Sequence, residues 1–571
     1  MIRRLRTAVA ILSVAATAAV PLGVAGATTI NATYHACRAG SVLTSVSVVA
    51  HACPHGTTVV SGHFAGANFT NANLTGANLA GAPLATTILT SVSSGAITGV
   101  PASLPTSWRL VHGYLVGPTA NLSRSNFDAI NLSGATLTRA NLQGAMFVRA
   151  NLTGVTLTGA NVSGSSFTSA ILTHVTTGSL TGRATTLPAS WRQVGGFLVG
   201  PGANLTGANL TGAALSGANL TATILTNATL TNATLTGATL VGTNVSNAIF
   251  QGASLGAVIS SRLVGTPASL PANWSVSSGL LLGPSANLSN QDLTGANLAN
   301  ANLSSANFSD SILTNDNVDG TNLSSANLTG ITSGSLQGTA ASLPTGWVQS
   351  VGYLAGPSVN LAGASLANGD FSSADLSSAN FYGADLTDAD FKGANLTDAS
   401  LSSATISGAL FAGATLTGVV SAYEIGTPAS LPTNWEVLSG PYEGQQVEYF
   451  VGPSAEIGGA YLSGNSFAGD DLSNIYMAAA NLVGSDFTGA NLQGADLASA
   501  SLGQTNLTNA DLTGANLSNA DMSGANFSGA NFTNANLSGA RLLSVQGQGS
   551  ATFQGATCPD GVKYGQLGAN C

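Results

Sequence analysis

Large apolar residues recur at every fifth position along most of the chain, and a small residue, usually Ala, stands two positions before each of them. Residues 72–76, Ala-Asn-Leu-Thr-Gly, are a typical unit. All 67 positions of the large-residue column hold Leu, Phe, Ile, Val or Met. A period of five fits neither an α-helix nor a flat strand, so it indicates a repeat architecture. The column runs without a gap over residues 64–89, 122–172, 205–255, 288–328, 361–416 and 457–542.

Each five-residue unit has the composition of a short extended segment followed by a turn. Residues two apart in an extended segment point to the same side, so the small and the large residue of a unit both point inward. Thr-Gly, Ser-Gly, Ser-Asn and Thr-Asn pairs then supply turn-prone residues. Alternating small and large side chains let successive coils interdigitate at core density, while the backbone bonds to coils about 4.8 Å above and below.

These units resemble the A-(D/N)-L-x-x motif of the pentapeptide-repeat family, and the resemblance covers all 67 units counted above. It implies an all-β fold, a right-handed quadrilateral β-helix in which four pentapeptides form one coil. We therefore expect a solenoid over residues 63–542. Because each coil of a solenoid contacts only its neighbours, its stability is expected to be nearly additive along the chain.

Five insertions interrupt the column, and each contains a Leu-Pro pair, a Trp and a Gly-Pro pair in that order. The spacing of the flanking large residues is the same in the first four copies, as from Leu89 to Leu122, and the fifth copy has eight extra residues around Glu443–Glu448. Fixed length and punctuation predict a hairpin-like excursion. Because the common spacing is not a multiple of five, we expect each insertion to reset the register. The insertions lie near residues 92–119, 175–202, 258–285, 331–358 and 419–454.

All five Trp residues of the chain lie in these insertions. One interpretation is structural, with each indole packed on its own hairpin or on the flank of the solenoid. The other is that the repeated aromatic rings are platforms that bind a sugar or another surface polymer. The sequence shows no polar group that converges on them. The candidate platform residues are Trp108, Trp191, Trp274, Trp347 and Trp435.

The two ends of the chain indicate an exported protein. A segment with three Arg, an apolar stretch and the sequence Ala25-Gly26-Ala27 predict a signal peptide over residues 1–27, with an uncleaved anchor as the alternative. The only four Cys lie in two terminal pairs, so local pairing predicts one disulfide within each Cys-containing end, 28–62 and 543–571. We expect these ends to cap the open sheet edges. The predicted pairs are Cys37 with Cys53 and Cys558 with Cys571.

Four of the six His residues interleave with the first Cys pair and suggest zinc as an alternative there. In an exported chain the disulfide is the favoured reading, so we predict no metal site and no cofactor.

Composition narrows the classes of function. Only 6% of the 571 residues are charged, the isoelectric point is 4.9 and there are two Lys, so we expect no nucleic-acid partner. Mean hydropathy is +0.30, yet no apolar stretch long enough to cross a bilayer follows the first 27 positions, so we expect no membrane span after leader cleavage.

Residues 370–571 carry 18 acids against three basic residues, and half of these acids take the outward Asn position. Positions about 20 residues apart should stack in a four-sided coil, which places Asp370 on Asp390 and sets the other acids against Asn or Ser, so that like charges are spaced.

No Ser-His-Asp order, paired carboxylates, phosphate loop or metal motif stands out from the repeat, so we expect no enzyme. We expect a secreted or cell-surface protein, a monomer, that acts as a structural or adhesin-like scaffold for an unknown protein or surface polymer. Binding of carbohydrate through the Trp insertions is the alternative. A third hypothesis comes from the resemblance, because some members of that family mimic DNA and inhibit topoisomerases in the cytoplasm. The predicted signal peptide disfavours it.

Overall fold

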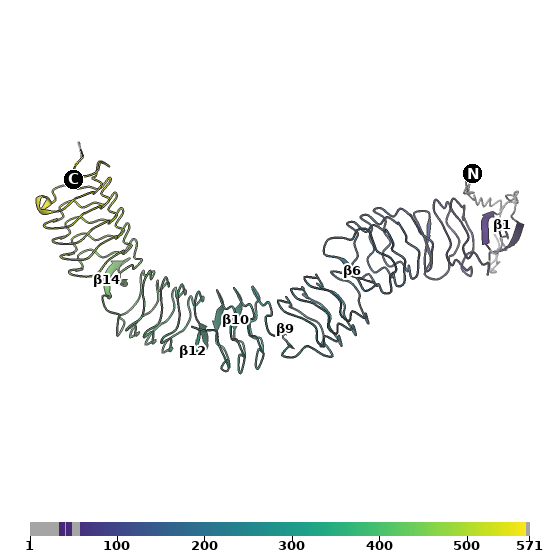
Figure 1. Ribbon diagram of the computed structural model, residues 1–571, viewed down its shortest axis with the longest axis horizontal. Helices are drawn as coiled ribbons and strands as arrows, with labels where there is room; N and C mark the ends of the chain where they lie inside the picture. The colour runs from purple at the N-terminus through teal and green to yellow at the C-terminus, as the bar shows by residue number, and fades with distance from the viewer. Residues whose placement is uncertain (1–32, 40–41, 48–57, 65, 567–570) are drawn as a thin grey trace. The chain divides into compact units, whose positions relative to one another are not determined.

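The computed structural model describes residues 33–39, 42–47, 58–64, 66–566 and 571, which fall into two compact units, Met1–Leu281 and Leu282–Cys571. The described residues form coils, short strands and one 3-10 turn, with no α-helix among them. Figure 1 shows the coils of each unit stacked on one another in sequence order. The predicted signal peptide, residues 1–27, lies outside the described residues.

Four pentapeptides form one coil, as expected. Asn121 pairs with Asn141 in a parallel bridge, and Asn141 pairs in turn with Asn161, the same position four pentapeptides later. The N–H of Leu122 donates to the carbonyl of Asn141 (2.8 Å), and the N–H of Asn141 donates to the carbonyl of Ala120 (2.9 Å). The prediction of an all-β, right-handed quadrilateral β-helix is confirmed.

The corners of the coil explain the turn residues of each unit. The N–H of Ser125 donates to the carbonyl of Leu122 (3.2 Å), which closes a four-residue turn. The residue before Ser125, Arg124, has φ +57°, and Gly134 has φ +67° at the equivalent corner. Positive φ at the third turn residue is the geometry of a type II turn, which Gly and Asn adopt at least cost.

The inward columns form the core of each unit. Ala140 and Leu142 have no exposed surface, and the same holds for most residues of the two columns. Where Phe replaces Leu in successive coils the rings stack, with centroids of Phe371 and Phe391 5.2 Å apart and those of Phe391 and Phe411 5.0 Å apart. The prediction that two residues per pentapeptide point inward is confirmed.

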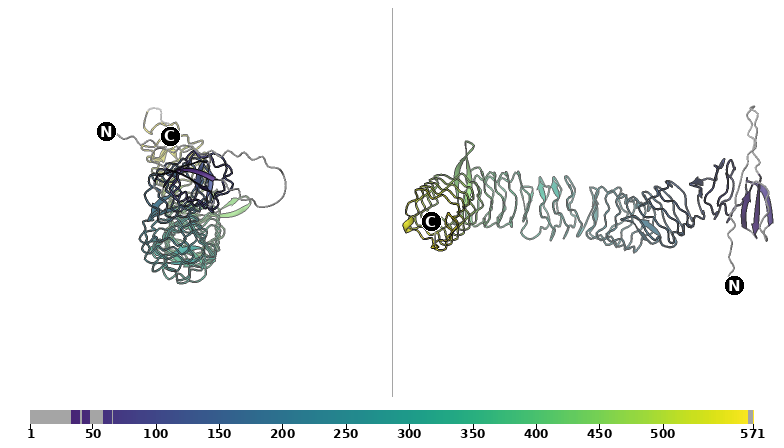
Figure 2. Two further views of the ribbon diagram at one scale, coloured as in Figure 1. Left: turned by 90° about the vertical axis from the view of Figure 1, so that its right-hand side faces the viewer. Right: turned by 90° about the horizontal axis from the view of Figure 1, so that it is seen from above.

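The five insertions form two-stranded hairpin sheets, which confirms the hairpin prediction. The fifth hairpin is longer than the others, and Figure 2 shows it in green, standing out from the coils of its unit. The pairs are β4 (Arg109–Val111) with β5 (Tyr114–Val116), β6 (Arg192–Val194) with β7 (Phe197–Val199), β8 (Ser275–Ser277) with β9 (Leu280–Leu282), β12 (Val348–Ser350) with β13 (Tyr353–Ala355), and β14 (Glu436–Tyr442) with β15 (Gln445–Val451).

An insertion lengthens one coil rather than shifting the stack. In a regular coil Thr176 would pair with position 196, but across the second insertion it pairs with Asn204. Val420 would pair with position 440 and instead pairs with Glu456 across the fifth insertion. The eight or sixteen additional residues are therefore contained in one coil. The five-residue period is reset at each insertion, as the sequence predicts, but the stacking continues on one face, that of Thr176 and Asn204 in the second insertion and that of Val420 and Glu456 in the fifth.

The two ends contain structure that the period did not predict. Before the first coil, β1 (Thr33–Ala39) pairs antiparallel with both β2 (Val42–Ser47) and β3 (Thr58–His63). At the other end, stacking extends beyond residue 542, and the ring of Phe553 lies 5.0 Å from that of Phe532. The 3-10 turn η1 (Gln548–Ser550) lies in this last coil.

In unit 2, β10 (Ile312–Thr314) and β11 (Thr332–Gly334) are parallel neighbours on successive coils.

Candidate functional sites on the coils and insertions

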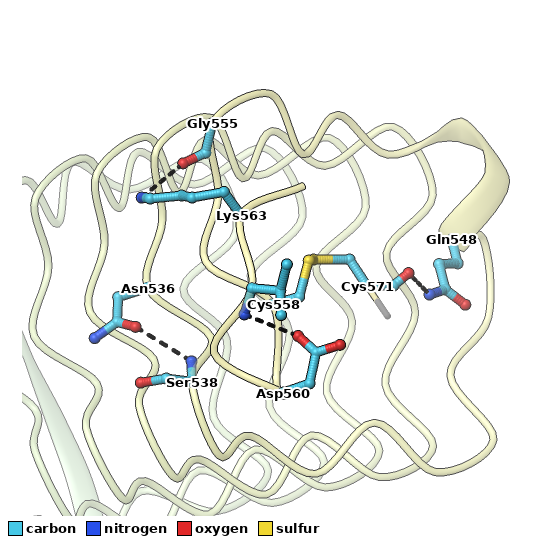
Figure 3. Close-up of a disulfide and its surroundings, with 9 residues drawn as sticks. Asn536, Ser538, Gln548, Gly555, Cys558, Asp560, Lys563 and Cys571 are labelled. Atoms are coloured by element: carbon cyan, nitrogen blue, oxygen red, sulfur yellow. Dashed lines mark hydrogen bonds between the residues drawn. A yellow bond between two sulfur atoms is a disulfide. The ribbon is translucent and has the colours of Figure 1, made fainter. Parts of the chain in front are cut away.

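The disulfide at the C-terminal end is present between Cys558 and Cys571, whose Cα atoms lie 4.9 Å apart. Cys558 is fully buried, and Figure 3 shows it beside the final coil. The side-chain amide of Gln548 donates to the carbonyl of Cys571, and Lys563 Nζ donates to the carbonyl of Gly555 (3.0 Å). At the other end, Cys37 lies in β1 but Cys53 is outside the described residues, so their pairing stays a prediction.

In each pentapeptide one residue lies between the two inward positions and points outward. On each face of the solenoid these residues stack from coil to coil, and we call each such stack an outer column. In the outer column of Asn121, Asn141 Nδ2 donates to Asn121 Oδ1 (3.0 Å), and Asn161 Nδ2 donates to Asn141 Oδ1 (3.3 Å). Each Asn also accepts the N–H two residues later, as Asn161 Oδ1 does from Ser163 (3.0 Å). This outer column is therefore ordered by side-chain bonds between coils and by bonds to the backbone two residues on.

Several aspartates in the outer columns of unit 2 have an Asn in the next coil. Asn491 Nδ2 donates to Asp471 Oδ1 (2.9 Å), and Asn516 Nδ2 donates to Asp496 Oδ1 (3.0 Å). A carboxylate only accepts hydrogen bonds, so an Asn in the next coil completes the pair where a second Asp would repel. Asp370 and Asp390 are stacked directly, as the spacing predicts, and Lys392 Nζ lies 3.0 Å from Asp390 Oδ2.

The five Trp side chains are half-buried against the coils. In four insertions the indole covers the Gly of the Gly-Pro pair so closely that a β-carbon there would overlap the ring. Trp274 packs on the core of unit 1. The arrangement is that of an anchor that holds the hairpin base to the coil. The four covered glycines are Gly117, Gly200, Gly356 and Gly452.

A Ser or Thr in each insertion, which the sequence analysis missed, bonds the returning strand. Thr177 Oγ1 accepts the N–H of Leu198 (2.9 Å), and Ser260 Oγ accepts that of Leu281 (2.8 Å). Each of these residues occupies the next five-residue position of the inward column, so the signal was a polar residue where Leu was due. Buried hydroxyls need such partners. The five residues are Ser94, Thr177, Ser260, Ser333 and Ser421.

The aromatic residue of the return strand also replaces a backbone partner. Tyr114 Oη accepts the N–H of Asn126 (3.3 Å), and Tyr353 Oη accepts that of Ser365 (3.2 Å). In a regular coil a carbonyl of the previous coil holds that place. The hydroxyl thus continues the ladder where the hairpin has left the coil.

Tyrosines and glutamates gather at the fifth insertion. All five Glu of the chain lie within residues 424–456, and five of the ten Tyr lie within 423–476. The rings of Tyr423 and Tyr442 are 4.3 Å apart, and those of Tyr442 and Tyr461 are 5.4 Å apart. The other four hairpins contain no acid. The fifth insertion therefore differs in chemistry as well as in length.

Two carboxyl groups are buried in unit 2. Glu424 accepts bonds from Ser421 Oγ and from the N–H of Ala422 (both 3.0 Å), and burial raises its pKa to about 8. Asp316 occupies an inward Ala position and accepts the N–H of Ala296 (2.9 Å), and burial raises its pKa to about 7. Burial favours the neutral form of a carboxyl group in both cases.

Neither a metal cluster nor a membrane span is found in the part of the chain that the structure describes. No three His, Cys, Asp or Glu side chains of that part gather as metal ligands would. His51 and His55, from the alternative zinc hypothesis, lie outside it. None of its helical segments has the length and apolar character needed to cross a bilayer.

The chain is similar to solved structures that include two described as pentapeptide repeat proteins. HetL of the cyanobacterium Nostoc sp. Strain PCC 7120, involved in heterocyst differentiation regulation, is 19% identical over 77% of this chain and 93% of its own, with a TM-score of 0.11. QnrB1, a plasmid-mediated fluoroquinolone resistance protein, is 16% identical over 44% of this chain and 89% of its own, with a TM-score of 0.16. A protein of the Arabidopsis thaliana thylakoid lumen is 33% identical over 14% of this chain and 64% of its own, with a TM-score of 0.10.

No curated protein matches the chain. The family model described as "Pentapeptide repeats (8 copies)" does match, and it covers more than half of the residues. The matched residues are 61–90, 120–154, 147–176, 201–227, 214–252, 285–315, 358–393, 394–420, 455–494, 471–509 and 510–542. The period, the four-sided coil and this match agree that the chain belongs to the pentapeptide repeat family.

Proposed function

We propose that the protein is an exported, non-catalytic scaffold whose outer columns bind a partner protein or surface polymer. The observation that carries the proposal is the ordering of the outer columns, as in the bonds that join Asn121, Asn141 and Asn161. Side chains that are already held in one rotamer lose less entropy when a partner binds. A stack of such columns offers a regular polar surface with few charges.

Export is proposed from the N-terminal sequence and from the Cys558–Cys571 disulfide. Disulfides persist mainly in oxidising compartments. A scaffold of this kind would meet its partner outside the cytoplasm, at the cell surface or beyond it.

Carbohydrate binding by the Trp residues has less support than the scaffold. A sugar-binding platform needs a broadly exposed ring, whereas the Trp side chains are half-buried and one face of four of the rings lies over a glycine, as in Trp108, Trp191, Trp347 and Trp435. DNA mimicry is also less well supported, because apart from Asp370 and Asp390 the outer-column acids in the described part of unit 2 are stacked on uncharged residues or on Arg541, so they form no dense anionic stripe.

The test begins with the full chain expressed in its source organism. Peptide mass mapping of the mature N-terminus and cell fractionation should show export and cleavage after Ala27. Proximity labelling from a peroxidase fused to the C-terminus should then identify a partner outside the cytoplasm.

Substitutions on single faces sharpen the test. Ser123→Arg with Gln143→Arg places bulk beside the outer column of Asn121, and Thr138→Arg with Thr158→Arg does so on a neighbouring face. A partner bound by one face should be lost with one pair and kept with the other. Recovery of uncleaved protein in the cytoplasm, with labelling indifferent to every such pair, would contradict the proposal.

A further inference from the structure

The residue after the Trp has different partners in different insertions. In the first insertion Arg109 Nη2 donates to the carbonyls of Leu132 and Ser133, the latter at 2.9 Å. In the second, Arg192 Nη1 donates to the carbonyl of Ser216 (3.0 Å) and Nη2 to that of Gly217 (3.3 Å). Both copies thus hold a guanidinium of the chain itself between the hairpin base and a turn of the following coils.

The fifth insertion has a carboxylate at this position, Glu436. A second acid, Asp470, takes the third small-residue position of the inward column after Ile457, in the coils that follow. The other four copies all have Ala at the equivalent position: Ala135, Ala218, Ala301 and Ala374. Compared with the first two insertions, the fifth has therefore exchanged an Arg and an Ala for two acids at one place in the fold.

A cavity of about 250 Å³ lies at this place, within unit 2. It is lined by Trp435, by the two acids Glu436 and Asp470, and by Asn434, Val451 and Leu472. Glu436 Oε1 is buried and has no hydrogen-bond partner. Asp470 can donate to it only while the pair of carboxyl groups shares a proton, so once both groups are ionised this buried oxygen lacks a donor, which is costly.

The surroundings favour a cation. Between Lys392 and Arg541 the chain has twelve acids and no Lys or Arg. Burial and the neighbouring Asp470 raise the pKa of Glu436 to about 7, which is the effect of two carboxyl groups that face each other without a counter-charge. A cation between them would remove that repulsion.

We propose that the cavity beside Trp435 binds the guanidinium group of an arginine side chain presented by a partner protein. The planar guanidinium can donate two parallel hydrogen bonds to a carboxylate and stack on an indole, and residues of both kinds line the cavity. Lysine has the charge but not the planar pair of donors. The first and second insertions show that this place in the fold accommodates a guanidinium when the chain supplies it. The proposal rests on the proposed scaffold function, to which it adds the chemistry of one contact.

The experiment uses the purified full chain and ligand-observed saturation-transfer NMR with blocked tripeptides. The probes are acetyl-Gly-Arg-Gly-amide, its isosteric citrulline analogue, the lysine analogue and free arginine. We expect the arginine peptide to bind at least ten-fold more tightly than the citrulline peptide and more tightly than the lysine peptide. Equal binding of arginine and citrulline peptides, or of lysine and arginine peptides, would overturn the guanidinium assignment. Tighter binding of free arginine than of the peptide would overturn the partner protein as its source.

Two variants test the place of binding. Glu436→Gln with Asp470→Asn keeps the volume and removes both charges, so affinity for the arginine peptide should fall at least ten-fold. Glu436→Arg restores the residue type of the first two insertions, so its guanidinium should occupy the cavity and abolish peptide binding without lowering the melting temperature. Glu443→Gln, at the exposed hairpin turn, is the matched control and should bind as the wild type does.

Unchanged binding by the double variant, at an unchanged melting temperature, would place the peptide elsewhere and end the proposal. Because this assay is independent of export and of the outer columns, its failure would leave the proposed scaffold function standing. Conversely, if the chain bound the arginine peptide but remained in the cytoplasm, the arginine site would stand and the proposed exported scaffold would fall.

Discussion

A regular coil and a lengthened coil of the same unit complete their hydrogen bonds by different means. In the regular coil the backbone suffices, since the N–H of Leu142 donates to the carbonyl of Asn161 (2.8 Å). In the lengthened coil of the first insertion, Ser94 Oγ accepts the N–H of Leu115 (2.9 Å) and Tyr114 Oη accepts that of Asn126. The comparison shows that the repeated backbone completes the hydrogen bonds between regular coils, whereas individual side chains complete them at the insertions.

The largest expected effect lies inside a regular block. Phe391→Ala removes the middle ring of the stack formed with Phe371 and Phe411, and the Phe391 side chain is fully buried. We expect a loss of about 3–5 kcal/mol of unfolding free energy, read from the denaturation midpoint in urea. Tyr382→Ala, at a side chain that is 57% exposed, is the control and should change the midpoint little. Equal effects of the two would mean that the inward column does not carry the stability.

A buried acid of the fifth insertion gives a pH-dependent contrast with the regular coils. The pKa of Glu424 is raised to about 8 from an ordinary value of 4.5, so folded protein holds this proton between those two values where unfolded protein does not. Its contribution to stability is complete below about pH 4.5 and is lost as the pH rises towards 8.

Glu424→Gln, which imitates the protonated form, should remove this dependence. We expect its melting temperature to exceed that of the wild type by several degrees at about pH 8.5, with little difference at about pH 5, in calorimetric scans. A constant difference across that range would show that Glu424 does not titrate in this way.

The next effect concerns the bond that holds a return strand. Ser260→Ala leaves the N–H of Leu281 without its acceptor in a buried site. We expect a loss of about 1–3 kcal/mol of unfolding free energy and faster hydrogen exchange at the amide of Leu281. Ser275→Ala, on the exposed side of the same hairpin, should change neither. Wild-type exchange in the Ser260 variant would show that the hydroxyl is not needed.

The smallest expected effect is the removal of one hydroxyl. Tyr353→Phe removes the acceptor of the N–H of Ser365 but leaves the ring in place. The second insertion already has Phe197 at this position, so the fold tolerates the change. We expect a loss of about 0.5–1.5 kcal/mol of unfolding free energy, read from the denaturation midpoint in urea. A loss as large as that of Phe391→Ala would mean that the hydroxyl does more than continue a ladder.

Much of the fold followed from the sequence because a five-residue period leaves few alternatives. The inward positions of Ala140 and Leu142 and the stacking of Asp370 on Asp390 could be counted directly. The hairpins followed from the fixed spacing of Pro, Trp and Gly-Pro. The Cys558–Cys571 bridge followed from short spacing near one end of the chain.

The bonds of individual side chains could not be predicted in this way. Ser94 and its equivalents resemble the many Ser of the turns, and only their place in the inward column distinguishes them. The cavity beside Glu436 is also lined by Asp470, which lies well beyond the hairpin in the chain. Each acid replaces another residue type in one insertion only, so the repeat gives no reason to expect the two side by side. The initial β1–β3 sheet has no repeat at all, so the period was silent about it.

The lengthened coil has a practical consequence. A hairpin leaves and rejoins the stack between the same two faces whether it adds eight residues or sixteen, as Thr176–Asn204 and Val420–Glu456 show. The length of an excursion is thus free to vary while the neighbouring coils stay as they are. A foreign peptide grafted at the turn between Tyr442 and Gln445 would be displayed at a known height along unit 2, and the other four hairpin turns offer further attachment points for such cargo.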